Sequence, residues 1–267
     1  MKTREKYEFY KPKKIFGQNF LVDDNISQKI IRQLDITDSD LVLEIGPGQG
    51  ALTKHLAELE ERYTAVEIDN AIASGLGIKY GSRINIINQD FLKFDLSQFG
   101  KKIKIVGNLP YNIASEILFR LFEFRGKIIC AVLMVQKEFA QRLVAKPDSK
   151  EYGILSVQTQ VFSRPSLLFS VPPTVFFPKP KVESSVIKLC FDNETDLKSI
   201  SIFKALVRAS FGKRRKIIKN SLKEYFEKTN ISFDDLDFDF TRRAENVKVE
   251  EYVALANRII NLIPDAQ

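Results

Sequence analysis

Short apolar runs alternate with amphipathic stretches along most of the chain. Five of these runs read as buried strands, at 41–45, 63–69, 84–90, 103–106 and 127–138. Between them, apolar residues recur at helical spacing, as in Ile113, Ile117, Leu118 and Leu121. Strands that alternate with helices predict an α/β fold with a mainly parallel, doubly wound sheet. Two further runs, 155–162 and 184–191, are predicted to be strands that pair antiparallel at the sheet edge.

The pattern changes after residue 191. The stretch 192–196 is polar and reads as a linker, and the remainder of the chain has helical spacing. Three apolar stripes mark amphipathic helices there: Phe203, Leu206, Val207 and Phe211; then Ile217, Ile218, Leu222 and Phe226; then Val253, Leu255, Ala256 and Ile259. We therefore expect two domains, 1–192 with the sheet and 193–267 made of helices.

Basic residues outnumber acidic ones, which favours an anionic partner. The chain of 267 residues has 41 Lys and Arg against 34 Asp and Glu, a formal net charge of +7. The candidate nucleic-acid-binding cluster, at the junction of the first two C-terminal helices, is Lys213, Arg214, Arg215 and Lys216. Residues 1–14 are also basic and aromatic, and are expected to form a flexible arm. The alternative for both segments is an ordinary solvated surface.

Cysteine and histidine are too scarce for several common kinds of site. The chain has two cysteines, Cys130 and Cys190, each inside an apolar run, and one histidine, His55. We expect buried free thiols, and neither a metal site nor a serine–histidine triad. No apolar run approaches the roughly 18 residues of a membrane helix, and the polar N-terminus does not resemble a secretory signal. A cytoplasmic protein without membrane contact is expected.

Three successive predicted strands end in residues suited to one ligand. The first ends in a loop with Gly46, Gly48 and Gly50, and such a loop before a helix lets a ligand approach backbone amides. The second ends at Glu67, where a carboxylate can accept both hydroxyls of a ribose. The third ends at Asp90, which can accept from the amino group of an adenine. The pattern predicts a cofactor with ribose and adenine, either NAD or another adenosine derivative.

The tetrapeptide Asn108-Leu109-Pro110-Tyr111, which follows the fourth strand, decides between these cofactors. An amino group conjugated to a ring is a poor nucleophile, because its lone pair is delocalised. The Asn108 side-chain oxygen and the Leu109 carbonyl can each accept one of its hydrogens, which aims the lone pair at a methyl donor. Pro110 stiffens this carbonyl, and the Tyr111 ring offers a stacking surface to an unpaired or flipped-out base. Since hydride transfer has no use for this element, the pattern predicts an amine methyltransferase.

A proline-rich loop, 171–182, is a second candidate wall of the base site. Its four prolines make it stiff, and Phe176 and Phe177 would otherwise be an exposed apolar pair, which often marks a site. Phe176 is therefore expected to supply the other face for the target base.

Seven segments of the chain resemble the ribosomal RNA adenine dimethyltransferase family. In order they are QNFL, EIGPGQGALT, VEID, NLPYNIAS, MVQKEFAQRL, FFPKPKVESSV and RRAENVKVEEYVALAN, from about residue 13 to residue 260. Within the family they are most similar to the enzymes that modify small-subunit (16S) rRNA in ribosome biogenesis. The resemblance implies transfer of methyl groups from S-adenosyl-L-methionine to two adjacent adenines near the 3′ end of that RNA. It also implies a Rossmann-like class I methyltransferase sheet with a small all-α C-terminal domain.

The resemblance also assigns residues, position by position. The implied cofactor contacts are Asn19, Leu21, Gly46, Glu67, Asp90 and Asn108. The implied base pocket consists of Asn108, Leu109, Pro110, Tyr111 and Phe176. Spacing alone would not have selected Asn19 or Leu21. One departure from the family pattern is the glycine-rich stretch 70–83, which is poor in the charged helix formers expected there.

Three other readings remain open at this point. The nearest is a large-subunit rRNA methyltransferase of the macrolide-resistance type, with the same chemistry. A non-catalytic ribosome-assembly factor could keep the fold, although the intact tetrapeptide and strand-end residues argue against lost catalysis. DNA and protein amine methyltransferases commonly have proline in place of Leu109. The expected partner is the rRNA of an assembling small-subunit (30S-type) particle, with the chain acting as a monomer.

Overall fold

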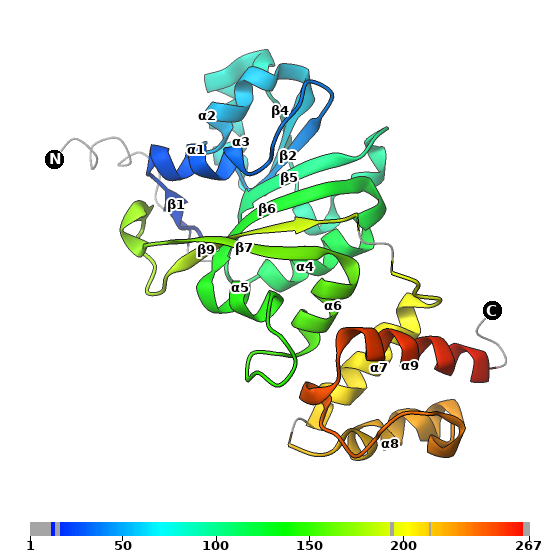
Figure 1. The fold of residues 1–267 in the computed structure, drawn as a ribbon. Helices are drawn as coiled ribbons and strands as arrows, with labels where there is room; N and C mark the ends of the chain where they lie inside the picture. The colour runs from blue at the N-terminus through cyan, green and yellow to red at the C-terminus, as the bar shows by residue number, and fades with distance from the viewer. Residues whose placement is uncertain (1–11, 14–16, 193–194, 214, 264–267) are drawn as a thin grey trace. The chain divides into compact units, whose positions relative to one another are not determined.

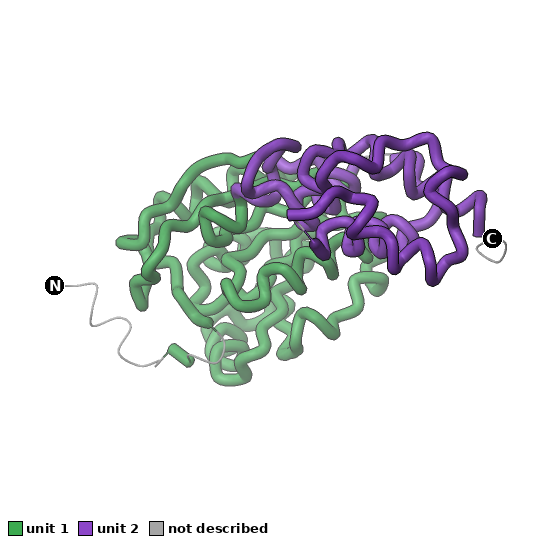
Figure 2. Tube along the Cα trace, turned by 90° about the horizontal axis from the view of Figure 1, so that it is seen from below, with its two compact units in different colours: residues 1–140, 166–191 green, residues 141–165, 192–267 purple. Residues whose placement is uncertain are grey.

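The computed structural model describes residues 12–13, 17–192, 195–213 and 215–263 (Figure 1). Most of the predicted arm at 1–14, and Arg214 of the basic cluster, therefore lie outside the described residues. By its internal contacts the chain separates into two compact units (Figure 2). Unit 1 comprises residues 1–140 and 166–191, and unit 2 comprises residues 141–165 and 192–267. Unit 2 thus contains the predicted helical region and, in addition, an earlier segment of the chain.

Unit 1 is built on a mixed sheet. Within the described residues this sheet has seven strands in the order β4-β3-β2-β5-β6-β9-β7 (Figure 1). Their bounds are β2 Leu41–Ile45, β3 Tyr63–Glu67, β4 Asn85–Asn88, β5 Ile103–Asn108, β6 Ile128–Gln136, β7 Arg164–Val171 and β9 Ser184–Cys190. The strands from β4 to β6 pair in parallel, and β9 runs antiparallel to β6. The predicted mainly parallel α/β sheet is confirmed.

The strand order reverses beside β2. The chain runs from β2 outward through β3 to β4, and then crosses to β5 on the other side of β2. Ile45, the last residue of β2, lies opposite Val66 in β3 and Gly107 in β5. The residues that follow, among them Gly46 and Asn108, therefore meet at one edge of the sheet. In open α/β sheets, ligands bind at this point of reversal.

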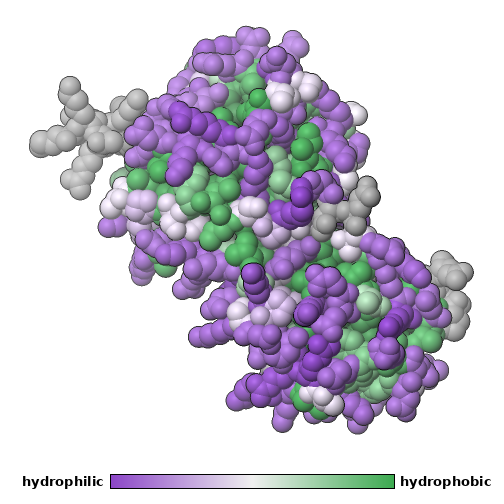
Figure 3. Space-filling model, viewed as in Figure 1, coloured by the Kyte–Doolittle hydropathy of each residue, from purple (hydrophilic) through white to green (hydrophobic). Residues whose placement is uncertain are grey.

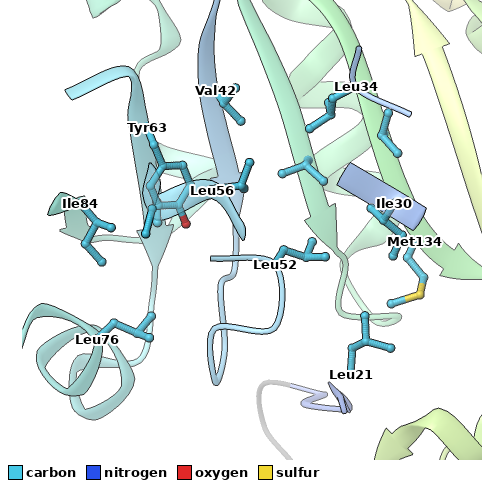
Figure 4. Close-up of a cluster of buried hydrophobic side chains, with 14 of the residues drawn as sticks. Leu21, Ile30, Leu34, Val42, Leu52, Leu56, Tyr63, Leu76, Ile84 and Met134 are labelled. Carbon is cyan, nitrogen blue, oxygen red and sulfur yellow. The ribbon is translucent and has the colours of Figure 1, made fainter. Parts of the chain in front are cut away.

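Helices cover both faces of the sheet (Figure 1). On one face, Ile30, Leu56 and Leu76 from three helices meet Val42 and Tyr63 from the strands in a buried core (Figure 4). Burying a leucine or isoleucine side chain stabilises the fold by about 1.5–3 kcal/mol, so this core holds the helices on the sheet. The helices on this face are α1 Asp24–Arg32, α2 Thr53–Leu56 and α3 Asn70–Tyr80, and α4 Ala114–Glu123 lies on the other.

Helix α3 forms in the stretch that departs from the family pattern. Gly75 and Gly77 lower its helix propensity, each by about 1 kcal/mol relative to alanine. Leu76 is buried in the core, and the Asp69 side chain caps the first turn by accepting a backbone N–H at 3.0 Å. Packing and the cap together outweigh the poor intrinsic propensity.

Two segments far apart in the sequence form a second, two-stranded sheet. Strand β1, Phe20–Leu21, pairs antiparallel with β8, Phe176–Phe177. Phe176 lies opposite Leu21 and is 4% exposed, whereas Phe177 is 42% exposed. The expectation of an exposed aromatic pair is therefore wrong for Phe176, because its partner strand covers it.

The stretch 155–162 is a helix, and its prediction as a strand is wrong. It belongs to α6, Ile154–Phe162, which follows α5, Lys137–Leu143, and the edge strand is instead the next segment, β7. Val157 and Val161, four residues apart, are both buried. Ser156 caps the first turn: its Oγ accepts from a backbone N–H at 3.0 Å and donates to the Arg142 carbonyl at 2.6 Å. Because most of this helix is buried, its hydrophobic pattern has no clear period.

Cys130 and Cys190 are both free thiols, as expected, but only Cys130 is buried, whereas Cys190 is partly exposed. They lie opposite each other on the neighbouring strands β6 and β9. Burial raises the pKa of the Cys130 thiol to about 11, so it is protonated at neutral pH.

Unit 2 is helical, which confirms the predicted C-terminal region. The core side chains from its three longer helices are Phe203, Leu206, Leu222, Phe226, Leu255 and Ile259, all fully buried. Those helices are α7 Ile200–Ser210, α8 Ile218–Thr229 and α9 Val249–Leu262, and α7 contacts both others. On the visible face, polar side chains cover most of each unit, and smaller apolar patches lie among these polar side chains (Figure 3). Among the described helices, none combines the length and apolar character needed to cross a bilayer.

Candidate active site

A cavity of about 230 Å³ lies at the carboxyl edge of the sheet in unit 1. Its wall is made by the residues that end β2, β3, β4 and β5, together with the segment 17–21 and the start of α4. The predicted site residues that line it are Asn19, Leu21, Gly46, Glu67, Asp90, Asn108, Leu109, Pro110 and Tyr111. The structure therefore brings the predicted cofactor residues and the predicted acceptor tetrapeptide into one space.

The loop after β2 turns sharply because its glycines have left-handed backbone conformations. Gly46 has a φ of +63° and Gly48 a φ of +54°. A Cβ on Gly48 would lie 2.9 Å from the Phe20 ring, whereas a Cβ on Gly46 would meet nothing within 4 Å. Gly48 is thus also required by crowding against β1. Gly46 leaves an open approach to the backbone on the cavity side.

Glu67 is bound to the backbone on two sides. Its Oε2 accepts from the Gly48 N–H at 3.1 Å, and its Oε1 accepts from the Asp69 N–H at 2.9 Å. Burial raises the pKa of its carboxyl, although these two hydrogen bonds act in the opposite direction. Each oxygen has a further lone pair, so the carboxylate can still accept ribose hydroxyls. Glu67 therefore connects the predicted ribose site to the glycine loop.

Asp90 starts the turn that follows β4. Its Oδ1 accepts from the Leu92 N–H at 2.9 Å, and this bond leaves Oδ2 as the acceptor for a ligand. Phe91 and Ile68 also line the cavity, and Ile68 is 47% exposed. They provide apolar surface for a flat ring beside the Asp90 carboxylate. Sequence reasoning missed Ile68, although it directly follows the acid that ends β3.

Asn108 ends β5 with its side chain held in one orientation. Its Nδ2 donates to the backbone carbonyl of Asn19 at 2.8 Å. The Asn19 side chain in turn donates to the Gly17 carbonyl at 3.2 Å. Since Nδ2 is used inside the protein, Oδ1 is the atom that Asn108 offers as an acceptor. This orientation is compatible with the predicted role of Asn108 as an acceptor for an amine, and that role stays a prediction.

The rest of the tetrapeptide is also anchored. The Leu109 N–H donates to the Met134 carbonyl at 3.0 Å, and Leu109 itself is 2% exposed. Pro110 follows, so the peptide that carries the Leu109 carbonyl has little freedom. The Tyr111 ring is half-buried, and its hydroxyl lies 2.7 Å from the Ser184 Oγ. Sequence reasoning missed Ser184, which lies 73 residues further along the chain.

Phe176 is not among the residues that line this cavity. It is buried under the pairing of β8 with β1, next to Leu21, which does line the cavity. Its contact with a target base stays a prediction.

Glu44 is a cavity-lining acid that sequence reasoning did not assign to the site. It is 1% exposed, and its Oε2 accepts from the Thr53 hydroxyl at 2.9 Å and from the Tyr63 hydroxyl. Burial raises the pKa of the Glu44 carboxyl from 4.5 to about 7, with the nearby Glu67 adding to the effect. An acidic residue inside an otherwise apolar strand was the signal that could have identified it.

The basic cluster lies in unit 2, between α7 and α8. Lys213, Arg215 and Lys216 are all exposed, while Arg214 lies outside the described residues. Arg208 on α7 and Lys219 on α8 are exposed as well. The described members of the cluster are thus available to a partner, and RNA binding by them stays a prediction.

The fold and the cavity together define a class of protein. The reversal of strand order in the parallel sheet places the glycine loop, Glu67 and Asp90 in one cavity with the oriented amide oxygen of Asn108. This arrangement is that of a Rossmann-like class I methyltransferase acting on an amine.

Comparisons with known proteins narrow the class. The sequence profile described as "Ribosomal RNA adenine dimethylase" matches residues 10–261. The chain is 44% identical over 255 residues to "Ribosomal RNA small subunit methyltransferase A" of Francisella tularensis subsp. novicida, covering 92% of this chain and 97% of that one. The structure is similar to a dimethyladenosine transferase from Plasmodium falciparum, with a TM-score of 0.74, 26% identity, and 91% and 96% of the two chains covered. It is also similar to the 23S rRNA methyltransferase ErmE, with a TM-score of 0.68, 26% identity, and coverages of 90% and 99%.

The chain belongs to the ribosomal RNA adenine dimethylase family, and it is a methyltransferase. The methyl donor of this class is S-adenosyl-L-methionine, and the residues present fit it. Gly46 leaves room for a ligand at the backbone, Glu67 can hold a ribose, and Asp90 can hold an adenine. The predictions of fold class, family and cofactor are confirmed.

Proposed function

We propose that this protein dimethylates the exocyclic amino groups of two adjacent adenines near the 3′ end of small-subunit (16S) rRNA. The family supports an adenine as the target, and relatives with 44% identity carry a small-subunit name. The observation that carries the chemistry is the orientation of Asn108. Its amide nitrogen is bound to the Asn19 carbonyl, so its oxygen is the atom available to an amine in the cavity.

The reaction follows from the properties of the adenine amino group. Its lone pair is delocalised into the ring, which makes the nitrogen planar and weakly nucleophilic. If Asn108 Oδ1 and the Leu109 carbonyl each accept one N–H, the nitrogen becomes more tetrahedral and its lone pair points at the donor methyl. S-adenosyl-L-methionine, when bound, supplies that methyl group. The effect is orientation and electrostatic stabilisation, with the displaced proton passing to solvent.

The same site can act twice on one base. After one transfer the amine keeps one hydrogen, which still has an acceptor in Asn108 or Leu109. Tyr111 provides a stacking face throughout, worth about 1–3 kcal/mol for one base. Phe176 is proposed to supply the second face, supported by the pairing of its strand with the cavity-lining Leu21. A base bound in this way must be unpaired or flipped out of its helix.

RNA binding is proposed to involve the C-terminal region. We assign methyl transfer to residues 1–192 and RNA binding to residues 193–267, with Lys213, Arg214, Arg215 and Lys216 as phosphate contacts. The exposure of Lys213, Arg215 and Lys216 supports this assignment. We further propose that a cytoplasmic monomer acts on an assembling small-subunit (30S-type) particle, since the target is a ribosomal RNA.

One experiment tests the target. The purified protein is incubated with labelled S-adenosyl-L-methionine and, in separate reactions, with unmethylated small and large ribosomal subunits, and the label is then mapped. We expect dimethyladenine at two adjacent positions near the 3′ end of the small-subunit RNA. Label confined to the large subunit would establish the alternative activity. Large subunits are included because the structure is similar to that of the 23S rRNA methyltransferase ErmE. RNA binding without label in either subunit would indicate an assembly factor.

A further inference from the structure

The hydroxyl of Tyr111 forms a hydrogen bond with a side chain on a strand that is distant in the sequence. Ser184 Oγ lies 2.7 Å from it, at the first position of β9. Ser184 is 0% exposed and sits opposite Gln136, the last residue of β6. Because it is fully buried, Ser184 cannot touch an RNA base itself. Whatever it contributes to the reaction must act through Tyr111.

This contact removes freedom that the Tyr111 ring would otherwise have. The backbone on its N-terminal side is restrained by Pro110, and the hydrogen bond holds the far end of the side chain. With both ends held, the ring plane at the cavity wall has one preferred direction. Stacking requires the tyrosine ring to lie parallel to the base. A ring that is already held in this orientation loses no further conformational freedom when the base binds.

We propose that Ser184 is a positioning residue for methyl transfer, which fixes the Tyr111 ring in the plane where the extruded adenine stacks. The proposal rests on the proposed function and adds a residue to it. Ser184 would affect the RNA-dependent step and leave binding of the methyl donor unchanged, because the proposed donor residues belong to other elements, Glu67 to β3 and Asp90 to the turn after β4.

The next residue on the same strand is a matched control. Ser185 is 1% exposed, and among the described residues its Oγ has no hydrogen-bond partner. Successive side chains of a strand point to opposite faces of the sheet, so Ser185 points away from Tyr111. Ser184→Ala and Ser185→Ala therefore remove the same atom from equally buried positions of β9. Only the first removes the bond to Tyr111.

The test is a double-mutant cycle on RNA methylation. The variants are Ser184→Ala, Ser185→Ala, Tyr111→Phe and the Ser184→Ala/Tyr111→Phe pair, assayed for kcat and KM with unmethylated small subunits at saturating methyl donor. One neutral hydrogen bond corresponds to about a fivefold effect, so we expect kcat/KM to fall about fivefold in Ser184→Ala and in Tyr111→Phe. The double variant should match Tyr111→Phe alone, because the bond can be lost only once. Ser185→Ala should behave as the wild type, and S-adenosylhomocysteine affinity by calorimetry should be equal in all variants.

The outcomes separate this proposal from the proposed function. If the wild type does not methylate small subunits, the proposed function fails. If the wild type is active and Ser184→Ala is equally active, or if the losses of the two single variants multiply in the pair, the positioning role is wrong. Thermal unfolding midpoints show whether Ser184→Ala has lost its fold. Tyr111→Phe, which breaks the same bond from the half-exposed side, then carries the test.

Discussion

The side-chain nitrogen of Asn108 donates a 2.8 Å hydrogen bond to the backbone carbonyl of Asn19, which lies 89 residues earlier in the chain. This bond fixes which atom of the amide is presented to the cavity. It also joins the acceptor tetrapeptide to the segment that precedes β1. Two residues that belong to separate motifs in the sequence thus form one hydrogen-bonded pair.

Replacing Asn108 by alanine should lower turnover far more than RNA binding. The oxygen that accepts an N–H from the amine is lost, and loss of one preorganised hydrogen-bonding group typically lowers kcat by about 10²–10³. Measured kcat and RNA affinity decide the point, since equal losses in both would indicate a structural role. Asn85→Ala is a suitable control, because Asn85 is an exposed asparagine on β4 that donates to Thr64 and does not line the cavity.

Glu67→Ala should weaken binding of the methyl donor by about 10- to 100-fold, the range for hydrogen bonds to a charged group. The ribose would lose its acceptor, and the N–H groups of Gly48 and Asp69 would lose theirs. Isothermal titration with S-adenosylhomocysteine measures the effect, with a thermal melt to show that the fold survives. Unchanged affinity in a folded variant would exclude the ribose assignment. Glu58→Ala serves as the control, because Glu58 is an exposed acid outside the cavity.

Glu44 should make stability fall as pH rises. Burial raises the pKa of its carboxyl from 4.5 to about 7, so between these values the folded state binds the proton that the unfolded state has released. Its contribution to the free energy of unfolding is therefore greatest at low pH and decreases as pH rises through about 7. The full shift corresponds to on the order of 3 kcal/mol.

The variant Glu44→Gln isolates this contribution, since glutamine keeps an oxygen for Thr53 and Tyr63 but does not titrate. Denaturant unfolding of both proteins at about pH 5 and about pH 8 should show a smaller pH effect in the variant than in the wild type. Parallel pH profiles for the two proteins would mean that other groups control the dependence.

Alanine at all four positions 213–216 should reduce RNA affinity and its dependence on salt. Each lost phosphate contact lowers the slope of log K against log salt by about 0.7–0.9, so the slope should fall by about 3. Filter binding or fluorescence titration over a range of salt concentrations provides the slope. Lys228→Ala is the comparison, because Lys228 is also exposed but is paired with Glu224 at 2.7 Å. A slope that does not move would leave the cluster as a solvated surface.

The parts of this site that follow local rules were predictable from the sequence. Glycines, Glu67 and Asp90 at the ends of apolar runs indicate both where each strand ends and which ligand groups it can bind, from a few neighbouring residues. Parallel pairing then brings these ends together without further information, as the register of Ile45 with Val66 and Gly107 illustrates. The helical stripes of the C-terminal region were readable for the same reason, since each has one apolar face.

The parts that depend on distant packing were not predictable. The hydrophobic pattern of α6 has no clear period because most of its surface is buried, so a strand and a helix could not be told apart. Phe176 was expected to be exposed because no neighbouring segment of the sequence indicates what covers it. In the structure it is covered by β1, which pairs with its strand. Ser184 lies in a segment that resembles the family, but nothing near it in the sequence indicates its hydrogen bond with Tyr111, 73 residues away.

The pairing of β1 with β8 has a consequence for how two ligands communicate. Leu21 belongs to the wall of the methyl-donor cavity, and its pairing partner Phe176 belongs to the proline-rich loop proposed to meet RNA. The two strands are bonded to each other, so a shift of that loop displaces the cavity wall with it. Thermodynamic linkage then makes the exchange mutual: whatever factor RNA applies to donor affinity, the donor applies to RNA affinity. The pairing of two dipeptides that are far apart in the sequence of unit 1 thereby places the donor cavity and the proline-rich loop in direct contact.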